Sequence, residues 1–360
     1  IKKQGARAAI QIHHAGREAK TRFTGLQPVA PSPLPAYKGA DMPRELTVSE
    51  IAQIVGRYAE AAERAQKAGF DAVEIHGASG YLVAEFLSAN ANHRKDAYGG
   101  DIESRARFLL EVIAAIRSKV GKAYPMWCRL NAKEFSIENG TTPEDARLTA
   151  QMAEKAGVDA IHISCWGGGV DSDAPFKPIP GQLLPFAQAM KKAVKVPVIA
   201  VGSISPALGA ATLREHNADL IAIGRALISD AAVGAKAESG KSDDIVPCIS
   251  CLRCVEEVVF RDRPMLCSVN PAIGREPEYE IRPASKKKRV LVIGGGPAGM
   301  EAARVAALRG HEVTLYEKDS ELGGQLISAV LPPHKARIKV LLDDFRNQMG
   351  KVGVKVYLGQ

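Results

Sequence analysis

Four cysteines stand close together in the last third of the chain, with a spacing typical of metal sites. Cys248, Cys251, Cys254 and Cys267 follow the pattern C-x2-C-x2-C-x12-C. Three neighbouring thiolates and a fourth from downstream can hold the corners of an iron–sulfur cubane or surround a tetrahedral zinc ion. The spacing slightly favours iron–sulfur, because structural zinc sites usually pair two C-x2-C knuckles. Disulfides are not expected, because the chain shows no export signal.

A second chemical signature is the glycine-rich stretch VLVIGGGPAG over residues 290–299. An apolar strand runs into Gly294, Gly296 and Gly299, and a helix over 300–309 follows. Backbone N–H groups at such a turn and helix start can bind a pyrophosphate. A second strand over 312–316 ends at Glu317, whose carboxylate is suited to accept hydrogen bonds from ribose hydroxyls. The combination predicts a dinucleotide-binding fold without distinguishing FAD from NAD.

The elements that must position the remaining chemistry alternate between short apolar runs and longer amphipathic stretches. This alternation is typical of a parallel α/β fold. Each of the three clearest helices ends near a glycine, and two begin at residues that favour helix starts, Asp101 and Thr142-Pro143. The pattern predicts strands over 8–13, 72–76, 126–131, 160–164, 196–201 and 220–223, and helices over 51–68, 103–120 and 143–156.

Six βα units fit a (β/α)8 barrel from which the first two units are missing, and an open doubly wound sheet is the alternative. We favour the barrel because polar residues and glycines gather where the strands end. Barrels carry catalytic and phosphate-binding groups at that face. The strand ends in question are His13-His14, His76-Gly77, Arg129, Gly202-Ser203 and Gly224-Arg225. The chain does not begin with Met and stops soon after a strand-like run, so we expect segments missing at both ends.

Length and composition limit the kinds of protein that this chain can be. The chain has 360 residues, of which 46% are hydrophobic and 24% charged, an ordinary globular composition. It contains no apolar run of membrane-spanning length and no secretory signal pattern, so we expect a cytoplasmic protein without a membrane partner. The net charge of +8 is spread along the chain without a nucleic-acid-binding motif, so no nucleic-acid partner is expected. Self-association into a homo-oligomer stays open.

The α/β alternation ends near Gly240, and this break defines the expected domains. Residues 1–240 form the barrel, residues 241–281 the cysteine segment, and residues 282–360 the start of the dinucleotide-binding domain. Cys128 and Cys165 lie alone on predicted strands, where they are interpreted as buried small hydrophobic residues.

Several stretches together resemble the Old Yellow Enzyme family. They are IQIHHAGR (10–17), EIHGASGYL (74–82), NHRKDAYGG (92–100) and RARF (105–108), with a phosphate-binding end over 199–203 and 223–225. The cysteine spacing and the dinucleotide-binding segment narrow the resemblance to the multidomain branch. That branch includes 2,4-dienoyl-CoA reductase, 2-enoate reductase, bile-acid-modifying reductases and trimethylamine dehydrogenase. The resemblance implies FMN in the barrel, a 4Fe-4S cluster on the cysteines, and FAD, reduced by NAD(P)H, in the C-terminal domain.

The resemblance also implies how FMN is held. Gln11 would hydrogen-bond the pyrimidine edge of the flavin, because an amide can donate and accept at once. Arg129 would sit beside flavin N1 and C2=O, where its positive charge stabilises the reduced anion. The phosphate would be bound by Gly202, Ser203, Gly224 and Arg225, two strand-end loops and one guanidinium.

The family's substrate-activating residues map onto one short stretch. Tyr81 matches the proton donor, and His76 matches the first of two residues that hydrogen-bond the substrate carbonyl. The second is usually His or Asn, but Ser79 occupies that position here, so another donor could take its place. We expect His14 and the stretch 94–96 to serve as scaffold, and the loop over 166–169 to shape the pocket without an assigned role.

The implied activity is reduction of a conjugated C=C in a small α,β-unsaturated acid, thioester or ketone. Electrons would pass from NAD(P)H to FAD, then through the 4Fe-4S cluster one at a time to FMN. One alternative is an amine dehydrogenase with reversed electron flow. That branch has Tyr at the position of His76 and His at the position of Ser79, and neither is present. A non-catalytic flavin electron-transfer subunit is the other alternative.

Overall fold

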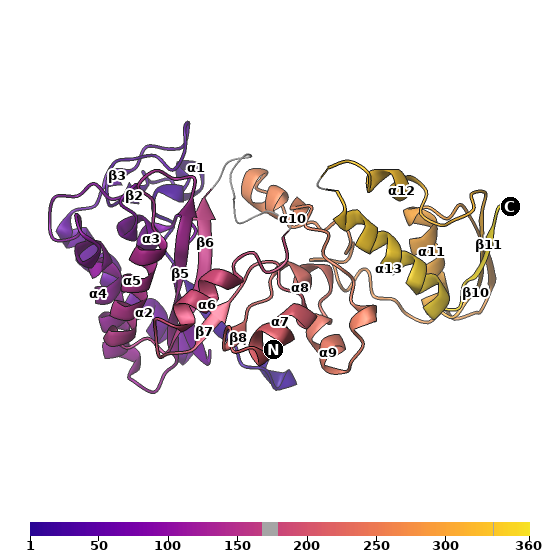
Figure 1. Cartoon of the computed structure of the whole chain (residues 1–360), viewed down its shortest axis with the longest axis horizontal. Coiled ribbons are helices and arrows are strands. Elements are labelled where there is room, and N and C mark those ends of the chain that lie inside the picture. Colours follow the sequence, from indigo (N-terminus) through magenta and orange to yellow (C-terminus); the bar gives the residue numbers. More distant parts are fainter. Residues whose placement is uncertain (168–178, 334) are drawn as a thin grey trace. The chain divides into compact units, whose positions relative to one another are not determined.

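The structure, a computed structural model, describes residues 1–167, 179–333 and 335–360. Contacts between elements divide the chain into two units, Ile1–Ala222 and Ile223–Gln360. Figure 1 shows the first in indigo and magenta and the second in orange and yellow. Each unit is described by itself.

Six parallel strands form the central sheet of the first unit (Figure 1). They are hydrogen-bonded in the order β1-β4-β5-β6-β7-β8, so every strand of this sheet neighbours the next one along the chain. Successive βα units produce this order, and all six predicted strands are confirmed. Within the described residues, β1 and β8 are the two edges of the sheet. The strands are β1 (Ala9–Ile12), β4 (Ala72–Gly77), β5 (Met126–Phe135), β6 (Ala160–Gly167), β7 (Val198–Ala200) and β8 (Leu220–Ile221).

The three predicted helices of the first unit are confirmed, and side-chain caps explain where they begin. Helix α2 starts with a capping box between Thr47 and Glu50, three residues earlier than predicted. Asp101 and Thr142 cap α4 and α5 as expected. Such caps bond N–H groups that the first helical turn leaves unpaired. The unit contains β2 (Val29–Ala30), β3 (Arg44–Glu45), η1 (Lys2–Gln4), η2 (Gly16–Glu18), α1 (Thr21–Thr24), α2 (Val48–Lys67), α3 (Leu82–Leu87), α4 (Ile102–Val120), α5 (Pro143–Ala156), α6 (Leu184–Lys191) and α7 (Pro206–Arg214).

The core of the first unit forms where the sheet meets its helices. Ile75, Leu130 and Ile161 from three adjacent strands are buried together with Phe108 and Ile113 of α4. Cys128 and Cys165 are buried free thiols in this core, as predicted. Strands packed in this way are expected to be almost continuously apolar, so the polar residues within them require an explanation.

Strands β5 and β6 are longer than the sequence predicts. Their pairing shifts register between Asn131 and Glu134 and then continues to Phe135 and Gly167. An added Cβ at Gly167 would overlap the carbonyl oxygen of Phe135, so only glycine allows this close strand approach. Trp166 and Gly167 therefore belong to a strand and not to the predicted loop. The rest of that loop, 168–169, lies outside the described residues.

The second unit holds a three-stranded parallel sheet in the order β11-β10-β9. The predicted succession of strand, glycine turn, helix and strand is confirmed by β9, α11 and β10. Helices α11 and α13 pack with this sheet around Met300, Leu315 and Leu342. The elements are α8 (Arg225–Ser229), α9 (Val233–Glu238), η3 (Ser242–Asp244), α10 (Arg253–Val255), η4 (Glu256–Phe260), β9 (Arg289–Ile293), α11 (Pro297–Leu308), β10 (Glu312–Glu317), α12 (Gln325–Ala329), α13 (Arg337–Lys351) and β11 (Lys355–Leu358).

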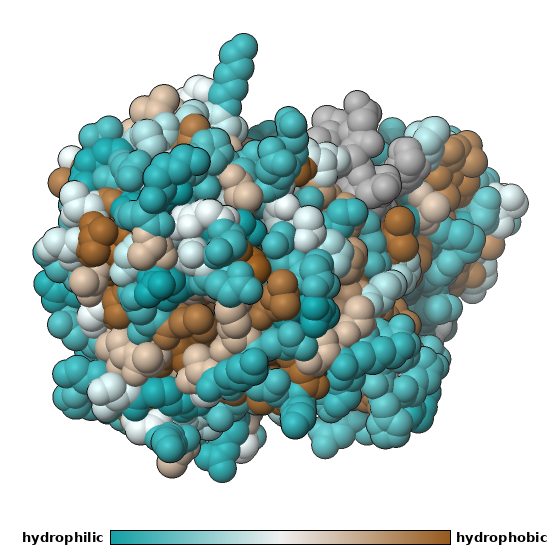
Figure 2. All heavy atoms as spheres, turned by 60° about the vertical axis from the view of Figure 1, so that its left-hand side comes forward, coloured by the Kyte–Doolittle hydropathy of each residue, from teal (hydrophilic) through white to brown (hydrophobic). Residues whose placement is uncertain are grey.

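The surface is mixed in polarity. Figure 2 shows hydrophilic side chains interspersed with smaller hydrophobic groups on one face of the molecule. Among the described residues, no helix combines the length and the apolar character needed to cross a membrane.

Candidate active site and cofactor sites

The strand register brings three separately predicted residues onto neighbouring strands. Gln11 on β1 pairs with Glu74 on β4, and His76 on β4 pairs with Arg129 on β5. Residues paired in parallel strands point to the same face, and residues two apart on one strand do so as well. Gln11, His76 and Arg129 therefore share one face of the sheet.

Tyr81 and His76 lie against each other at this face. Tyr81 precedes α3, and its ring centre lies 4.9 Å from that of His76 in an edge-on arrangement. Burial, together with the positive charge of Arg129, lowers the pKa of His76 to about 4. Burial, with a contribution from the charge of Glu18, raises the pKa of Tyr81. At neutral pH the site thus holds a neutral imidazole and a protonated phenol, one able to donate a hydrogen bond and the other a proton.

Arg129 presents a positive charge with an unsatisfied donor. Its Nη2 donates to Ser164 Oγ at 3.0 Å, whereas its buried Nε has no hydrogen-bond partner among the described residues. The buried Nδ1 of His76 also lacks a partner within the described part of the chain. Buried polar atoms are normally satisfied, so unpaired groups here indicate a missing ligand. The acceptor-rich pyrimidine edge of a flavin fits Arg129, and the carbonyl oxygen of a small ligand fits His76.

A buried carboxylate network beneath the site was missed by the sequence analysis. Glu74 accepts hydrogen bonds from Gln11 Nε2 and from Trp127 Nε1, the latter at 2.5 Å, and its Oε2 lies 2.6 Å from His162 Nδ1. Burial would raise the pKa of Glu74, but these partners hold it below its usual value. The only local signal is a charged residue within the apolar strand AVEIHG. The network fixes the Gln11 side chain, the predicted flavin contact.

The position of Ser79 is fixed by its backbone conformation and by a backbone hydrogen bond. It takes a left-handed φ of 60°, and its N–H donates to Asn131 Oδ1 at 3.2 Å. The amide Nδ2 of Asn131 is buried and lacks a partner within the described residues. A serine hydroxyl in this position has a shorter reach than the His or Asn of the family pattern.

Two groups predicted as scaffold have scaffold contacts. Arg94 is buried, pairs with Asp96 and donates to the carbonyl oxygens of Pro31 and Leu46. His14 Nδ1 accepts the N–H of Gly16 at 3.0 Å. These bonds hold the loops that flank the site.

The predicted phosphate-binding residues fall into both units. Gly202 and Ser203 follow β7 in the first unit, and Gly202 has a φ of 115°. A Cβ added at Gly202 would come within 2.8 Å of Leu183, so the position requires glycine. Gly224 and Arg225 begin the second unit. A phosphate site shared by the two pairs therefore stays a prediction.

The four predicted cysteine ligands line one small cavity in the second unit. Arg225 and Ile228 contribute to the same cavity. Burial and the other three thiols raise the pKa of Cys254, which indicates that the four sulfur atoms lie near one another. Ser250 and Leu252 take left-handed φ values of 53° and 59°, which bend the loop between the cysteines.

Among the described residues, no group of three or more Cys, His, Asp or Glu side chains is placed to hold one metal ion. A tetrahedral zinc ion would draw the sulfur atoms to roughly 3.8 Å from one another, given Zn–S bonds of about 2.3 Å. Four thiols around one cavity are a ligand set that suits either zinc or an iron–sulfur cluster. The identity of the metal stays a prediction.

The glycine-rich loop has the close contacts of a dinucleotide-binding turn. Gly294 has a φ of 98°, and a Cβ at Gly299 would overlap the carbonyl oxygen of Gly294. Gly296 precedes the first residue of α11, where helix N–H groups favour a pyrophosphate. Glu317 is buried and accepts the N–H groups of Gly295 and Asp319 at 2.5 and 2.9 Å, which lower its pKa. Glu317 therefore stabilises the turn itself, in addition to its predicted role toward ribose.

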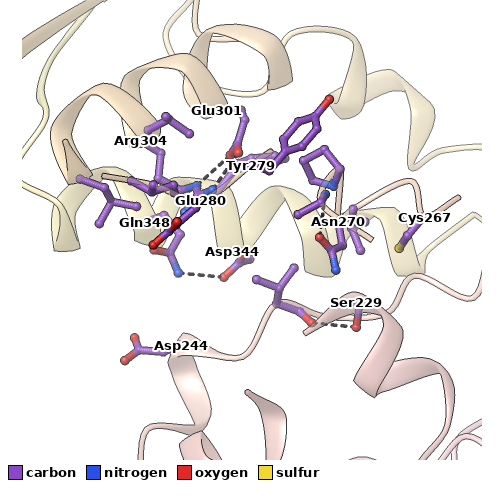
Figure 3. A pocket seen from close by; sticks show the side chains of 18 of the residues that line it. Ser229, Asp244, Cys267, Asn270, Tyr279, Glu280, Glu301, Arg304, Asp344 and Gln348 are labelled. Carbon is purple, nitrogen blue, oxygen red and sulfur yellow. Dashed lines mark hydrogen bonds and ion pairs between the residues drawn. The ribbon is translucent and has the colours of Figure 1, made fainter. Parts of the chain in front are cut away.

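A cavity of about 930 Å³ in the second unit was not predicted. Figure 3 shows Glu301, Arg304 and Asp344 on one side of it and Asp244 and Ser229 on the other. Glu301 pairs with Arg304 at 2.7 Å, and burial raises the pKa of Asp344. Both cationic and anionic side chains line the cavity, so its lining does not specify the charge of a ligand.

Two family models match the chain. The model described as NADH:flavin oxidoreductase / NADH oxidase family covers residues 1–244, and that of FAD dependent oxidoreductase covers residues 289–354. The four cysteines, from Cys248 to Cys267, lie between the two matched ranges.

Relatives match nearly the whole chain. NADH oxidase of Thermoanaerobacter brockii is 45% identical over 99% of this chain and 55% of its own length. Cinnamate reductase of Clostridium sporogenes is 36% identical over 98% of this chain and 56% of its own. The structure of a 2-naphthoyl-CoA reductase complex aligns with a TM-score of 0.95 at 34% identity, over 100% of this chain and 57% of that one. The chain thus spans about half the length of these relatives. It belongs to the NADH:flavin oxidoreductase / NADH oxidase family, in its multidomain branch related to Old Yellow Enzyme.

Proposed function

We propose that the protein reduces the C=C bond of a small α,β-unsaturated carbonyl compound, with electrons that come from NAD(P)H. The observation that carries this proposal is the contact between neutral His76 and protonated Tyr81, with ring centres 4.9 Å apart. A hydrogen-bond donor and a proton donor side by side suit an activated alkene, which must be polarised at oxygen and protonated at carbon.

Most residues of the proposed FMN site belong to the first unit. The sheet is proposed to be part of a (β/α)8 barrel, the fold that the family implies. Gln11 and Arg129 would bind the pyrimidine edge of the flavin, and Gly202, Ser203, Gly224 and Arg225 its phosphate. When bound there, FMN supplies the hydride that the β-carbon of the substrate accepts. Arg129 favours this chemistry because its fixed charge stabilises an anion beside it.

The remaining steps belong to side chains of the chain. His76 donates a hydrogen bond to the carbonyl oxygen and so draws electron density away from the β-carbon. Tyr81 then gives its phenolic proton to the α-carbon, which completes the saturated product. Water returns a proton to the Tyr81 phenolate, so that one hydride and one proton are consumed in each turnover.

The second unit is proposed to deliver the electrons. FAD would be bound by Gly294, Gly296, Gly299 and Glu317, and when bound it would supply the acceptor for a hydride of NAD(P)H. The four cysteines, Cys248, Cys251, Cys254 and Cys267, would hold a 4Fe-4S cluster that carries single electrons between the two flavins. In this proposal, residues 1–240 form the FMN domain, residues 241–281 the cluster segment and residues 282–360 the start of the FAD domain.

The experiment uses the full-length parent protein, purified anaerobically. Flavin absorbance is followed under NADH and then NADPH, after which cinnamate, a dienoyl thioester and an enone are added in turn. Bleaching by a nicotinamide followed by reoxidation with one of the three supports the proposal and identifies the substrate class. Bleaching by an amine, with no response to either nicotinamide, refutes it and indicates an amine dehydrogenase.

A further inference from the structure

His13 lies beside Tyr81 and His76 but has no role in the proposed reaction. It follows β1, whose register pairs Ile12 with Ile75, so His13 lies opposite His76. The ring centres of His13 and His76 are 6.0 Å apart, and those of His13 and Tyr81 are 4.8 Å apart in an edge-on arrangement. The phenol therefore contacts two imidazoles, His76 on β4 and His13 just after β1.

Both imidazoles are suited to donate hydrogen bonds. Burial lowers the pKa of His13, and burial with the charge of Arg129 lowers that of His76. Each ring is thus neutral near pH 7 and carries one N–H donor. The His13 ring packs against Tyr81 and His76, but the residue as a whole keeps a solvent-exposed surface, so an entering substrate can reach it.

Two neighbouring polar residues are less suited to this role. Ser79 uses its N–H for Asn131 and has only a short hydroxyl to offer. The Nδ1 atom of His14 accepts a hydrogen bond from the N–H of Gly16, and the carbonyl oxygen of His14 accepts one from the N–H of Leu82. Of the two imidazoles that contact Tyr81, His76 is the proposed first donor, and His13 is placed to act as a second one.

We propose that His13 is a catalytic residue that donates the second hydrogen bond to the substrate carbonyl oxygen, beside His76 and in place of a side chain at Ser79. The inference rests on the proposed function. A carbonyl oxygen has two lone pairs and accepts two donors, and both bonds strengthen as hydride addition places negative charge on it. His13 keeps its proton throughout, because Tyr81 supplies the one that the product retains.

The test compares two substitutions in the flavin-loaded full-length protein. His13→Phe keeps an aromatic ring but removes the donor, and His13→Asn keeps an N–H donor. With cinnamate or the dienoyl thioester as probe, we expect His13→Phe to lower kcat/KM by about 10- to 100-fold. The loss should appear more in kcat than in KM, and His13→Asn should stay within a few-fold of wild type. Recovery of activity in His13→Phe upon Ser79→Asn would add support.

Controls separate the inference from the proposed function. Flavin content and the rate of flavin reduction by NAD(P)H are measured for each variant, and His13→Ala replaces His13→Phe if the larger ring displaces the flavin. If wild type reduces none of the carbonyl probes, the proposed function itself fails. If wild type reduces a probe and His13→Phe does so equally well, the inference is wrong. Equal losses in the Phe and Asn variants also overturn it, because ring packing would then be the cause.

Discussion

The charge state of His76 makes the stability of the first unit depend on pH. Its pKa of about 4, in place of 6.5, favours the neutral ring in the folded state. Because the folded pKa is the lower one, this stabilisation is present above pH 6.5 and is lost as the pH falls toward 4. The charged neighbours of His76 are Arg129, His13, Glu74 and His162. Between pH 7 and 4.5, we therefore expect the free energy of unfolding to fall by about 2 kcal/mol because of His76 alone.

His76→Asn removes this titration and keeps a hydrogen-bonding side chain. Urea unfolding is followed by tryptophan fluorescence, because both tryptophans of the chain, Trp127 and Trp166, lie in the first unit. From pH 7 to pH 4.5 the free energy of unfolding should fall in both proteins, and we expect the fall to be about 2 kcal/mol smaller in the variant than in wild type. His216→Asn is the matched control, since it removes an exposed histidine whose φ of 56° asparagine tolerates. Equal losses in wild type and His76→Asn would refute the assignment of His76 as a buried neutral residue.

Three further predictions concern the other parts of the site. Tyr81→Phe should slow C=C reduction by about 10²- to 10⁴-fold in stopped-flow measurements, and an unchanged rate would exclude Tyr81 as the proton donor. Glu74→Leu leaves the N–H donors of Gln11 and Trp127 unpaired and should destabilise the first unit by roughly 3–5 kcal/mol. The change is measured by circular dichroism during urea unfolding, and a loss of stability below about 1 kcal/mol would contradict the network. Gly299→Ala should expel FAD, because its Cβ overlaps the Gly294 carbonyl oxygen, whereas Gly350→Ala meets no atom within 4 Å and should retain FAD. Equal FAD content in the two variants, measured after release of the flavin, would contradict this account.

Local sequence determined the elements and the cofactor-binding motifs. Apolar runs predicted all six strands of the large sheet, and the caps at Asp101 and Thr142 predicted two helix starts. The turn from Gly294 to Gly299 could be predicted because its glycines are required by backbone contacts within a few residues. Such features depend on short-range sterics and hydrogen bonds, which a sequence pattern states directly.

Only the tertiary structure decided which distant side chains meet. Glu74 and His162 are separated by 88 positions, and their contact depends on the register of three strands. The meeting of His13 with Tyr81 likewise requires that β1 pair with β4 in one register, since a shift by one residue would turn His13 to the other face. The extension of β5 and β6 past the bulge depends on a close backbone approach that no local pattern predicts. Residue types and spacing thus identify the chemistry, and long-range packing decides which groups act together.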